Sequence, residues 1–358
     1  MSQGTDRLLV TEELLAQRLE MVLRWYEGMI NERTGFFEYL YVPDSDAFVR
    51  EQSPIRDVAT IWDAALLGDF LKRDRLRDVI ERSMARYRAY LVPHDDSLIL
   101  DPLHLGEPSS IAHSAFMILA LLAGSSPRSD KDIAALAEGI VRQQRPDGSY
   151  KVFFEDLPDS GEELYAGEAM LALLETHHRL GDKRLLDSAT RAFAYYDENY
   201  FRGGRVTDDL LVFFANWQSQ ACRLLFEQAG TPAVTTAVAK YLFAMHDDII
   251  ARGFFDAVAR DPDRQVSVEV ACALEGLNDA YAIALALHDA RTESYRRAIC
   301  IGLGYLVALQ CTQNCAPRET GGFGMSLRDR TQRIDVTGHA ASAFLKAIAN
   351  RVTDDSMR

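Results

Sequence analysis

Four titratable side chains stand inside apolar stretches of the sequence, where a lone charge is costly to bury. These candidate catalytic residues are Asp63, His113, Glu168 and His339. Glu168 lies a full turn inside a predicted apolar helix, so an ionised carboxylate there must be paired or lose several kcal/mol to desolvation. His113 is surrounded by apolar residues, which suits a satisfied core histidine, a proton-transfer group or a metal ligand. We expect one acid/base pair to come from this set.

His339 follows Asp335 by four residues, which is one turn of a helix, so this carboxylate could orient the imidazole. Asp63 has a structural alternative, an ion pair with Arg56. N-capping is the alternative for Asp208 and Asp335, because each precedes a predicted helix. The residues expected to bind substrate are Arg56, Trp62, Tyr165, Asp208, Trp217, Glu275 and Asp335.

Several known catalytic patterns are missing from the sequence. It contains no GxSxG, no GxxxxGK[ST], no HExxH and no dinucleotide fingerprint after a strand. Serine hydrolase, nucleotide-phosphate and zincin functions therefore have no support, and we predict no cofactor.

The sequence contains five cysteines, an odd number, and three of them stand in apolar helical runs. Reduced thiols are therefore expected. Cys311 and Cys315, spaced CxxxC, are alternative metal ligands, but Cys and His partners at zinc-finger spacing are missing. We predict no metal.

The composition describes one large acidic domain. The 358 residues are 48% hydrophobic, enough for a sizeable core, and show no low-complexity linker. A net charge of −14 works against binding to a nucleic-acid backbone. With no apolar signal-peptide core and no run of 18 uncharged apolar residues, we expect a cytoplasmic protein without a membrane span. The sequence leaves homo-oligomerisation open.

The stretch Glu162–Tyr200 predicts two helices folded back on each other. Apolar residues recur at helical spacing on both sides of Gly181-Asp182, a C-cap glycine followed by a helix N-cap. The first helix is apolar around most of its circumference, whereas the second is amphipathic. We therefore interpret the first as an inner helix and the second as an outer one.

This alternation continues along the chain. The predicted helical segments are Thr11–Arg33, Ile55–Lys72, Leu76–Leu91, 109–123, Asp130–Gln144, the hairpin Glu162–Tyr200, Asp208–Glu227, Ala233–Ala251, Ser267–His288, Ser294–Thr312 and Val336–Asn350. Inner helices begin near residues 56, 109, 164, 208, 267 and 336. Six hairpins that bury their apolar faces on one another predict a closed all-α (α/α)6 toroid spanning 1–358, with short β-like loops at one end. An open solenoid is the alternative.

The hairpin, together with QQRPDGSY, LYAGEAMLALLETHHRLGD and GGFGMSL…RIDVTGHAASAFLKA, resembles the (α/α)6 toroids of the N-acylglucosamine 2-epimerase and six-hairpin glycosidase kind. This resemblance implies a pocket at one end of the barrel where His or carboxylate side chains move protons on a sugar. The QxxxDGS and GGFG elements are also similar to terpenoid cyclases and protein prenyltransferases. The sequence departs from those, since it has neither a DxDD motif nor their zinc ligands.

Three hypotheses follow. The first is a carbohydrate-active enzyme that epimerises, isomerises or cleaves a small-molecule sugar or glycan. The second is a terpenoid-type cyclase that protonates an isoprenoid in an aromatic box, and the third is a toroid that only binds partners. Aromatic residues crowd the predicted loops, either as packing or as walls for a sugar or an apolar ligand; they include Phe36, Tyr39, Tyr150 and Phe323.

Overall fold

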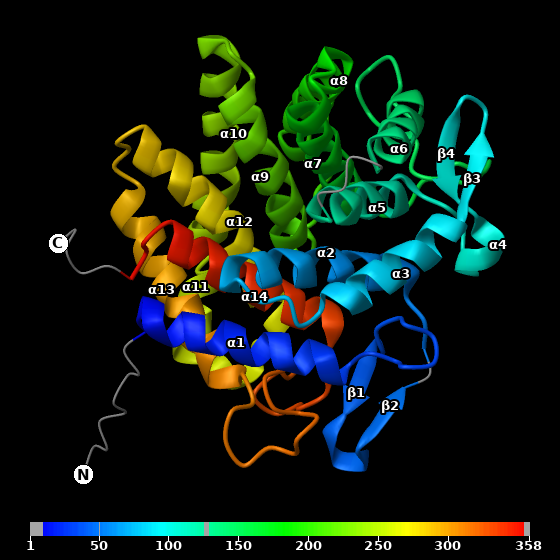
Figure 1. Cartoon of the computed structure of the whole chain (residues 1–358). Coiled ribbons are helices and arrows are strands. Elements are labelled where there is room, and N and C mark those ends of the chain that lie inside the picture. The colour runs from blue at the N-terminus through cyan, green and yellow to red at the C-terminus, as the bar shows by residue number, and fades with distance from the viewer. Residues whose placement is uncertain (1–9, 50, 125–128, 354–358) are drawn as a thin grey trace.

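The computed structural model describes residues 10–49, 51–124 and 129–353, and these form two concentric rings of helices (Figure 1). The inner ring comprises α2 (Pro54–Leu71), α5 (Ile111–Ala123), α7 (Glu162–Leu180), α9 (Leu211–Gln228), α12 (Ser267–Ala286) and α14 (Ile334–Ala349). The outer ring comprises α1 (Glu12–Gly28), α3 (Arg77–Ala89), α6 (Asp130–Arg142), α8 (Lys183–Tyr195), α10 (Pro232–Ala251) with the short α11 (Phe254–Arg260), and α13 (Thr292–Leu309).

The inner ring is closed. Each inner helix packs against the next one in sequence, and α14 returns to pack against α2. The predicted (α/α)6 toroid is therefore confirmed, and the open solenoid is excluded. Helix α5 shows why the inner helices need this arrangement: all of its residues from Ile111 to Leu121 are buried. The outer helix α8 buries only a stripe that includes Leu185, Ala189 and Phe193.

Glycines let the inner helices approach closely where they cross. A Cβ at Gly167 of α7 would lie 2.6 Å from the Cβ of Trp217 on α9. A Cβ at Gly276 of α12 would lie 2.9 Å from the Cα of Asn216. Because no side chain separates these backbones, residues on neighbouring helices reach into a narrow common interior.

Ion pairs tie the far end of the barrel together, where the inner helices finish. The carboxylate of Asp279 on α12 accepts from Arg223 of α9 at 3.2 Å and from Lys346 of α14 at 2.6 Å. The Asp279 side chain is only 2% exposed, so both contacts offset its desolvation.

The near end of the barrel, where the inner helices begin, carries the short strands. β1 (Leu40–Val42) pairs with β2 (Ala47–Val49) and with β5 (Gln332–Arg333), both antiparallel. This sheet places the loop before α2 beside the residues that open α14. A separate hairpin, β3 (Leu91–His94) with β4 (Ser97–Leu100), precedes the short α4 (Pro102–Leu105), and the sequence did not predict it.

Several predicted boundaries are wrong for local reasons. The first helix ends at Gly28 rather than Arg33, because Asn31 turns the chain by accepting from the backbone N–H groups of Arg33 and Thr34. α9 begins at Leu211, so Asp208 lies in the preceding turn and is not an N-cap. Tyr150 and Phe153, in the loop between α6 and α7, form isolated bridges with Gln144 and Ser110.

The cysteine prediction is wrong at one pair. Cys311 and Cys315 form a disulfide, with their Cα atoms 6.1 Å apart, in the loop between α13 and β5. The other three cysteines, Cys222, Cys272 and Cys300, are reduced thiols, as predicted. Among the described residues, no helix combines the length and apolarity needed to cross a bilayer.

Candidate functional site

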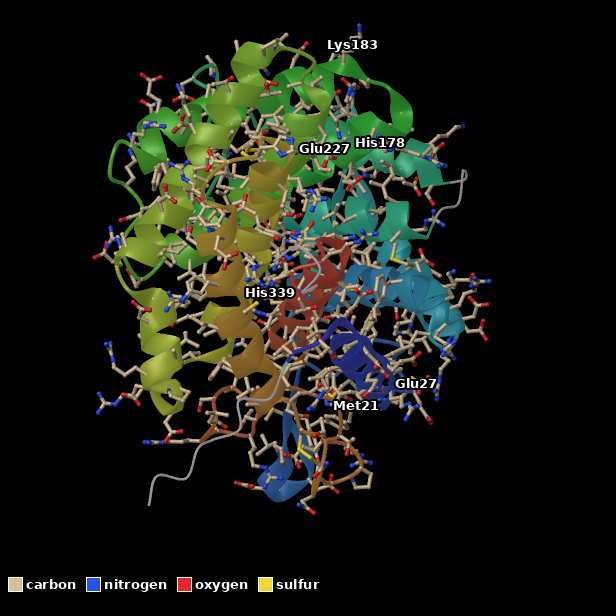
Figure 2. The ribbon with its side chains drawn as sticks, turned by 90° about the vertical axis from the view of Figure 1, so that its left-hand side faces the viewer. Met21, Glu27, His178, Lys183, Glu227 and His339 are labelled. Atoms are coloured by element: carbon tan, nitrogen blue, oxygen red, sulfur yellow. A yellow bond between two sulfur atoms is a disulfide. The ribbon has the colours of Figure 1, made fainter. Side chains whose placement is uncertain are left out.

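Five inner helices send polar or aromatic side chains to a common depth of the barrel. These residues are Asp63 on α2, Glu168 on α7, Trp217 on α9, Glu275 on α12 and His339 on α14. Each lies between the sixth and the tenth residue of its helix, so the group sits roughly two turns below the inner helix starts. Figure 2 shows His339 in the middle of the molecule, far from His178 at the other end of α7.

His339 and Glu275 form the ion pair at the centre of this site. The Nδ1 atom of His339 lies 2.8 Å from Oε2 of Glu275, which also accepts from the side-chain amide of Asn216 at 2.9 Å. Burial lowers the pKa of His339, but the neighbouring Cys272 thiol and Glu275 carboxylate outweigh it and raise this pKa well above its usual value. Burial raises the pKa of Glu275, yet the charge and hydrogen bond of His339 lower it to about 2. The pair is therefore an imidazolium and a carboxylate.

Asp63 lies against the helix that carries His339. A Cβ at Gly338 would overlap the Asp63 carboxylate and come within 3.3 Å of the Tyr26 hydroxyl, so glycine makes room for both groups. Burial raises the pKa of Asp63 to about 7, although the positive charge of His339 opposes the shift. The side chain nevertheless keeps some exposed surface. It is thus enclosed by protein but not sealed.

Glu168 is the second carboxyl group with a displaced pKa. The residue is 4% exposed, and burial raises its pKa to about 8 against the opposing charges of His339 and Arg56. Its Oε2 atom has no hydrogen-bond partner within the described part of the chain. At neutral pH Glu168 is therefore mainly a protonated acid with one oxygen unengaged.

Arg56 and Arg333 hold Asp335 at the near end of the site. Arg56 donates from Nε to Asp335 at 2.9 Å, and Arg333 makes a two-pronged contact with the same carboxylate. Both guanidinium groups lie over the ring of Tyr39, 5.5 Å from its centroid. Burial raises the pKa of Asp335, but the hydrogen bond and charge of Arg333 and the charges of Arg56 and His339 give a net lowering. Asp335 is thus an ionised member of a charged clamp.

Two predicted partnerships are wrong. Asp335 was expected to orient His339, but Nδ1 of the imidazole is paired with Glu275. The alternative pairing of Arg56 with Asp63 is also wrong, because Arg56 binds Asp335 instead. Spacing in the sequence identifies residues that are neighbours on one helix. The observed pairs instead join two helices each: His339 of α14 with Glu275 of α12, and Arg56 of α2 with Asp335 of α14.

An aromatic row crosses the site. The rings of Trp62 and Phe116 are 6.3 Å apart, those of Phe116 and Trp217 are 5.5 Å apart, and Trp217 meets His339 edge-on at 5.7 Å. Tyr165 belongs to the same region: burial raises its pKa, and the charge of Glu168 adds to this shift. Trp62, Trp217 and Tyr165 therefore lie near the titratable groups, and their contact with substrate stays a prediction.

His113 and Asp208 differ from the rest of the predicted set. His113 is buried, and its ring takes part in a capping box with Ser110 and lies 3.1 Å from Glu107. Both ring nitrogens thus have partners, which fits the satisfied core histidine. Asp208 is 84% exposed and pairs with Arg252 at 2.5 Å, so it does not reach the site.

The sequence reasoning missed Cys272, Asn216, Tyr26 and Gly338. Cys272 stands three residues before Glu275, on the same face of α12, and this spacing was the available signal. Asn216, Tyr26 and Gly338 could be recognised only from contacts between different helices. The potential metal ligands among the described residues are Cys311, Cys315 and Glu319, whose donor atoms lie within 4.8 Å of one another. They belong to the disulfide loop and not to this site.

Comparison with solved structures finds the same architecture. A sugar epimerase from a ruminal bacterium matches with a TM-score of 0.68 and 14% identity, over 95% of this chain and 99% of that one. An unsaturated glucuronyl hydrolase specific for heparin matches with a TM-score of 0.69 and 10% identity, over 95% of this chain and 99% of that one. A D-mannose isomerase matches with a TM-score of 0.70 and 11% identity, over 97% of this chain and 100% of that one. No protein-family description matches the sequence, and no relative is found among curated proteins. At these identities the likeness shows the (α/α)6 fold.

Proposed function

We propose that this protein is a carbohydrate-active enzyme that transfers protons on a sugar, by epimerisation or isomerisation. The observation that carries the proposal is the meeting of the His339–Glu275 ion pair with Asp63 and Glu168 inside one end of the barrel. Several titratable groups with displaced pKa values close to one another are typical of acid/base sites. Proteins of the same fold include sugar epimerases and a mannose isomerase.

The roles follow from the protonation states. Asp63, with a pKa of about 7, is ionised often enough to remove the proton from a carbon beside the sugar carbonyl. The His339 imidazolium donates its proton to the carbonyl oxygen, which gives an enediol. Glu168, which keeps its proton at neutral pH, returns one to carbon while the now neutral His339 takes back the enediol hydroxyl proton, which regenerates the carbonyl. Proton transfer from Asp63 to Glu168 then restores the starting states. Arg56 and Trp217 hold the sugar.

Glycosidic cleavage is the second candidate, favoured by the protonated state of Glu168. An inverting hydrolase needs one protonated acid for the leaving oxygen and one carboxylate to activate water. Glu168 and Asp63 offer this combination, and a solved structure of the same fold is a glucuronyl hydrolase. The terpenoid-cyclase alternative is disfavoured, because an aromatic box with a lone acid would not need an imidazolium–carboxylate pair.

Isotopes distinguish the two reactions. We would incubate a panel of free sugars and glycosides in D₂O and, separately, in ¹⁸O-water. Epimerisation or isomerisation places deuterium on the carbon beside the carbonyl, whereas hydrolysis places ¹⁸O in a new hydroxyl group. The same panel includes prenyl diphosphates, whose turnover would support a cyclase instead.

Variants test the assignment of residues. Glu168→Gln and His339→Ala are expected to lower kcat/KM at least 100-fold, in the range typical of a lost general acid or base. His178→Ala is the control, since His178 lies on α7 with Glu168 but in its last turn. Parent-like activity of both site variants would refute the assignment.

We also propose the cytoplasm as the place of action, with a free sugar or glycan as the partner. This proposal carries forward the expectation drawn from the sequence. Fractionation of the producing cells would test it, and recovery from the secreted fraction would refute it.

A further inference from the structure

A cavity lies beside the start of α2, apart from the proposed catalytic groups. Its volume is about 760 Å³, within the roughly 300–1,000 Å³ typical of ligand pockets. Residues between Asn31 and Tyr39, Phe48 and residues 51–54 line it, together with Tyr90 just after α3 and His104 of α4. None of the proposed catalytic groups lines this cavity, so its purpose is not explained by the proton transfers above.

Aromatic rings form one wall of this cavity. Tyr90 and His104 are stacked, with centroids 4.8 Å apart and an interplanar angle of 21°. Asp101 fixes the His104 ring through a contact of 2.6 Å with Nδ1. Phe36 lies 5.1 Å from Tyr87, and Tyr87 meets Tyr90 edge-on at 5.6 Å. This wall offers flat apolar surface to the C–H face of a ring-shaped ligand.

Hydrogen-bonding groups line other parts of the cavity. Asp57 is 5% exposed and accepts from the Phe37 backbone N–H at 2.7 Å and from the Tyr87 hydroxyl at 2.6 Å. Glu38 accepts from Asn31 at 2.6 Å, and Glu51 adds a third carboxyl group. Each carboxylate can accept further hydrogen bonds, which suits a ligand rich in hydroxyl groups. Among the described residues that line the cavity, three acids stand beside Arg33 and His104, and this balance favours a neutral ligand over an anionic one such as a sugar phosphate.

One side chain connects the lining of this cavity with the charged clamp around Asp335. Arg56 donates from Nη1 to Ser53, which lines the cavity, at 3.0 Å. Its Nε donates to Asp335 of the charged clamp at 2.9 Å. The Tyr39 ring, which also lines the cavity, lies under the same guanidinium. Arg56 therefore contacts both the lining of the cavity and the charged clamp.

We propose that this cavity is a second saccharide-binding site, which holds a neutral sugar unit of an oligosaccharide while another unit reacts beside His339. The inference rests on the proposed function and narrows its substrate to a neutral oligosaccharide of two or more units. Tyr90 supplies the stacking surface, and Asp57 and Glu38 accept from the hydroxyl groups. Tyr90 acts on substrate binding and not on the proton transfers.

A chain-length series tests this site. We would compare kcat/KM for glucose and mannose with kcat/KM for their 1,4-linked oligosaccharides of two to four units. Tyr90→Ala should lower kcat/KM for the oligosaccharides about tenfold and leave the single sugars within about twofold, since a stacked ring contributes on the order of one factor of ten. Tyr90→Phe keeps the ring and should behave like the parent. Phe70→Ala removes a 41% exposed ring near the other end of α2 and serves as the control.

The outcomes separate the two proposals. Equal kcat/KM for single sugars and oligosaccharides in the parent, or an equal loss for both in Tyr90→Ala, would overturn the second site while leaving sugar chemistry intact. If the parent turns over no sugar, the proposed function fails. In that case calorimetric titration with the tetrasaccharides decides about the cavity: binding weakened at least fivefold by Tyr90→Ala supports it, and no binding or unchanged binding refutes it.

Discussion

Glu168 shows how burial alone can prepare an acid for work at neutral pH. Its side chain is buried with most of α7, and one carboxyl oxygen has no partner among the described residues. Because burial disfavours the charged form, the pKa rises to about 8. The folded protein therefore binds a proton at this position more tightly than the unfolded chain does, and stability depends on pH accordingly.

The pH dependence of Glu168 can be measured. Its folded pKa of about 8 lies above the model-peptide value, so its protonated form contributes stability fully below about pH 4.3, and this contribution is lost as the pH rises towards 8. Glu168→Gln keeps the shape without the charge. We expect urea unfolding to show little difference between variant and parent near pH 5, and a more stable variant at pH 8.5. A parent at least as stable as the variant at pH 8.5 would contradict a buried neutral acid.

Gly338 is predicted to control Asp63. Gly338→Ala places a methyl group where the Asp63 carboxylate lies, so the carboxylate must move. We expect a loss of about 1–3 kcal/mol in unfolding free energy and a fall in kcat larger than any change in KM. Thermal melts and steady-state kinetics would check both. Gly304→Ala is the matched control, because a Cβ at Gly304 meets no atom within 4 Å.

Residue chemistry was predicted better than residue pairing. Asp63, Glu168 and His339 could be found from the sequence because a titratable group in an apolar helix is costly unless it has a purpose or a partner. The partner of His339 could not be found in this way. Glu275 lies 64 positions earlier in the chain, and only the packing of α12 against α14 brings the two together.

The loop from Gln310 to Gln332 is held by backbone hydrogen bonds, a buried carboxylate and a disulfide. Its backbone pairs Cys311 with Gly321 and Gly322, and Phe323 lies close to Thr337 at the start of α14. Glu319 is 1% exposed and binds Arg330 through both carboxylate oxygens. The loop therefore rests on the helix that carries His339, and the Cys311–Cys315 disulfide closes its first turn.

Removing this disulfide should have a moderate effect. Closing so short a loop contributes roughly 2 kcal/mol by chain-entropy reasoning, so Cys311→Ser/Cys315→Ser should lower the unfolding free energy by no more than that. Maleimide labelling of the denatured parent should count two more thiols after reduction than before it. Cys300→Ser is the control. An unchanged count would contradict the disulfide and restore the prediction of reduced thiols.

Helix existence followed from the sequence, but helix ends and small strands did not. The apolar periodicity of Glu162–Tyr200 predicted α7 and α8 because Gly181 and Asp182 carry the turn signal locally. α9 lacked such a signal, and the acidic pair at Asp208 suggested a cap that the chain does not use. The sheet of β1, β2 and β5 joins segments nearly 300 residues apart, which no local pattern reveals.

For the whole molecule, closure of the inner ring depends on both ends of the barrel. The near end has the Arg56–Asp335 pair between α2 and α14, and the far end has Asp279 between α9 and α14. The closed ring itself was predictable, because helices apolar on all sides can be buried only by neighbours on all sides.

Asp279→Asn tests the far end. The substitution leaves Arg223 and Lys346 without their shared carboxylate, and we expect the unfolding free energy to fall by about 2 kcal/mol, because both cations are partly exposed. Glu227→Gln removes a more exposed partner of Arg223 and should change stability by less than about 0.5 kcal/mol. Equal effects of the two variants in urea titrations would show that the far-end cluster does not hold the ring.

The position of α14 between α1, α2 and α12 has a consequence for protein synthesis. The ribosome makes α14 after the five other inner helices, so a nascent chain carries Asp63, Glu168 and Glu275 long before it carries His339. Until that last helix emerges, the apolar flanks of α2 and α12 have no neighbour and are exposed to aggregation or to chaperones. Completion of the proposed site and protection from misassembly thus come in the same late event.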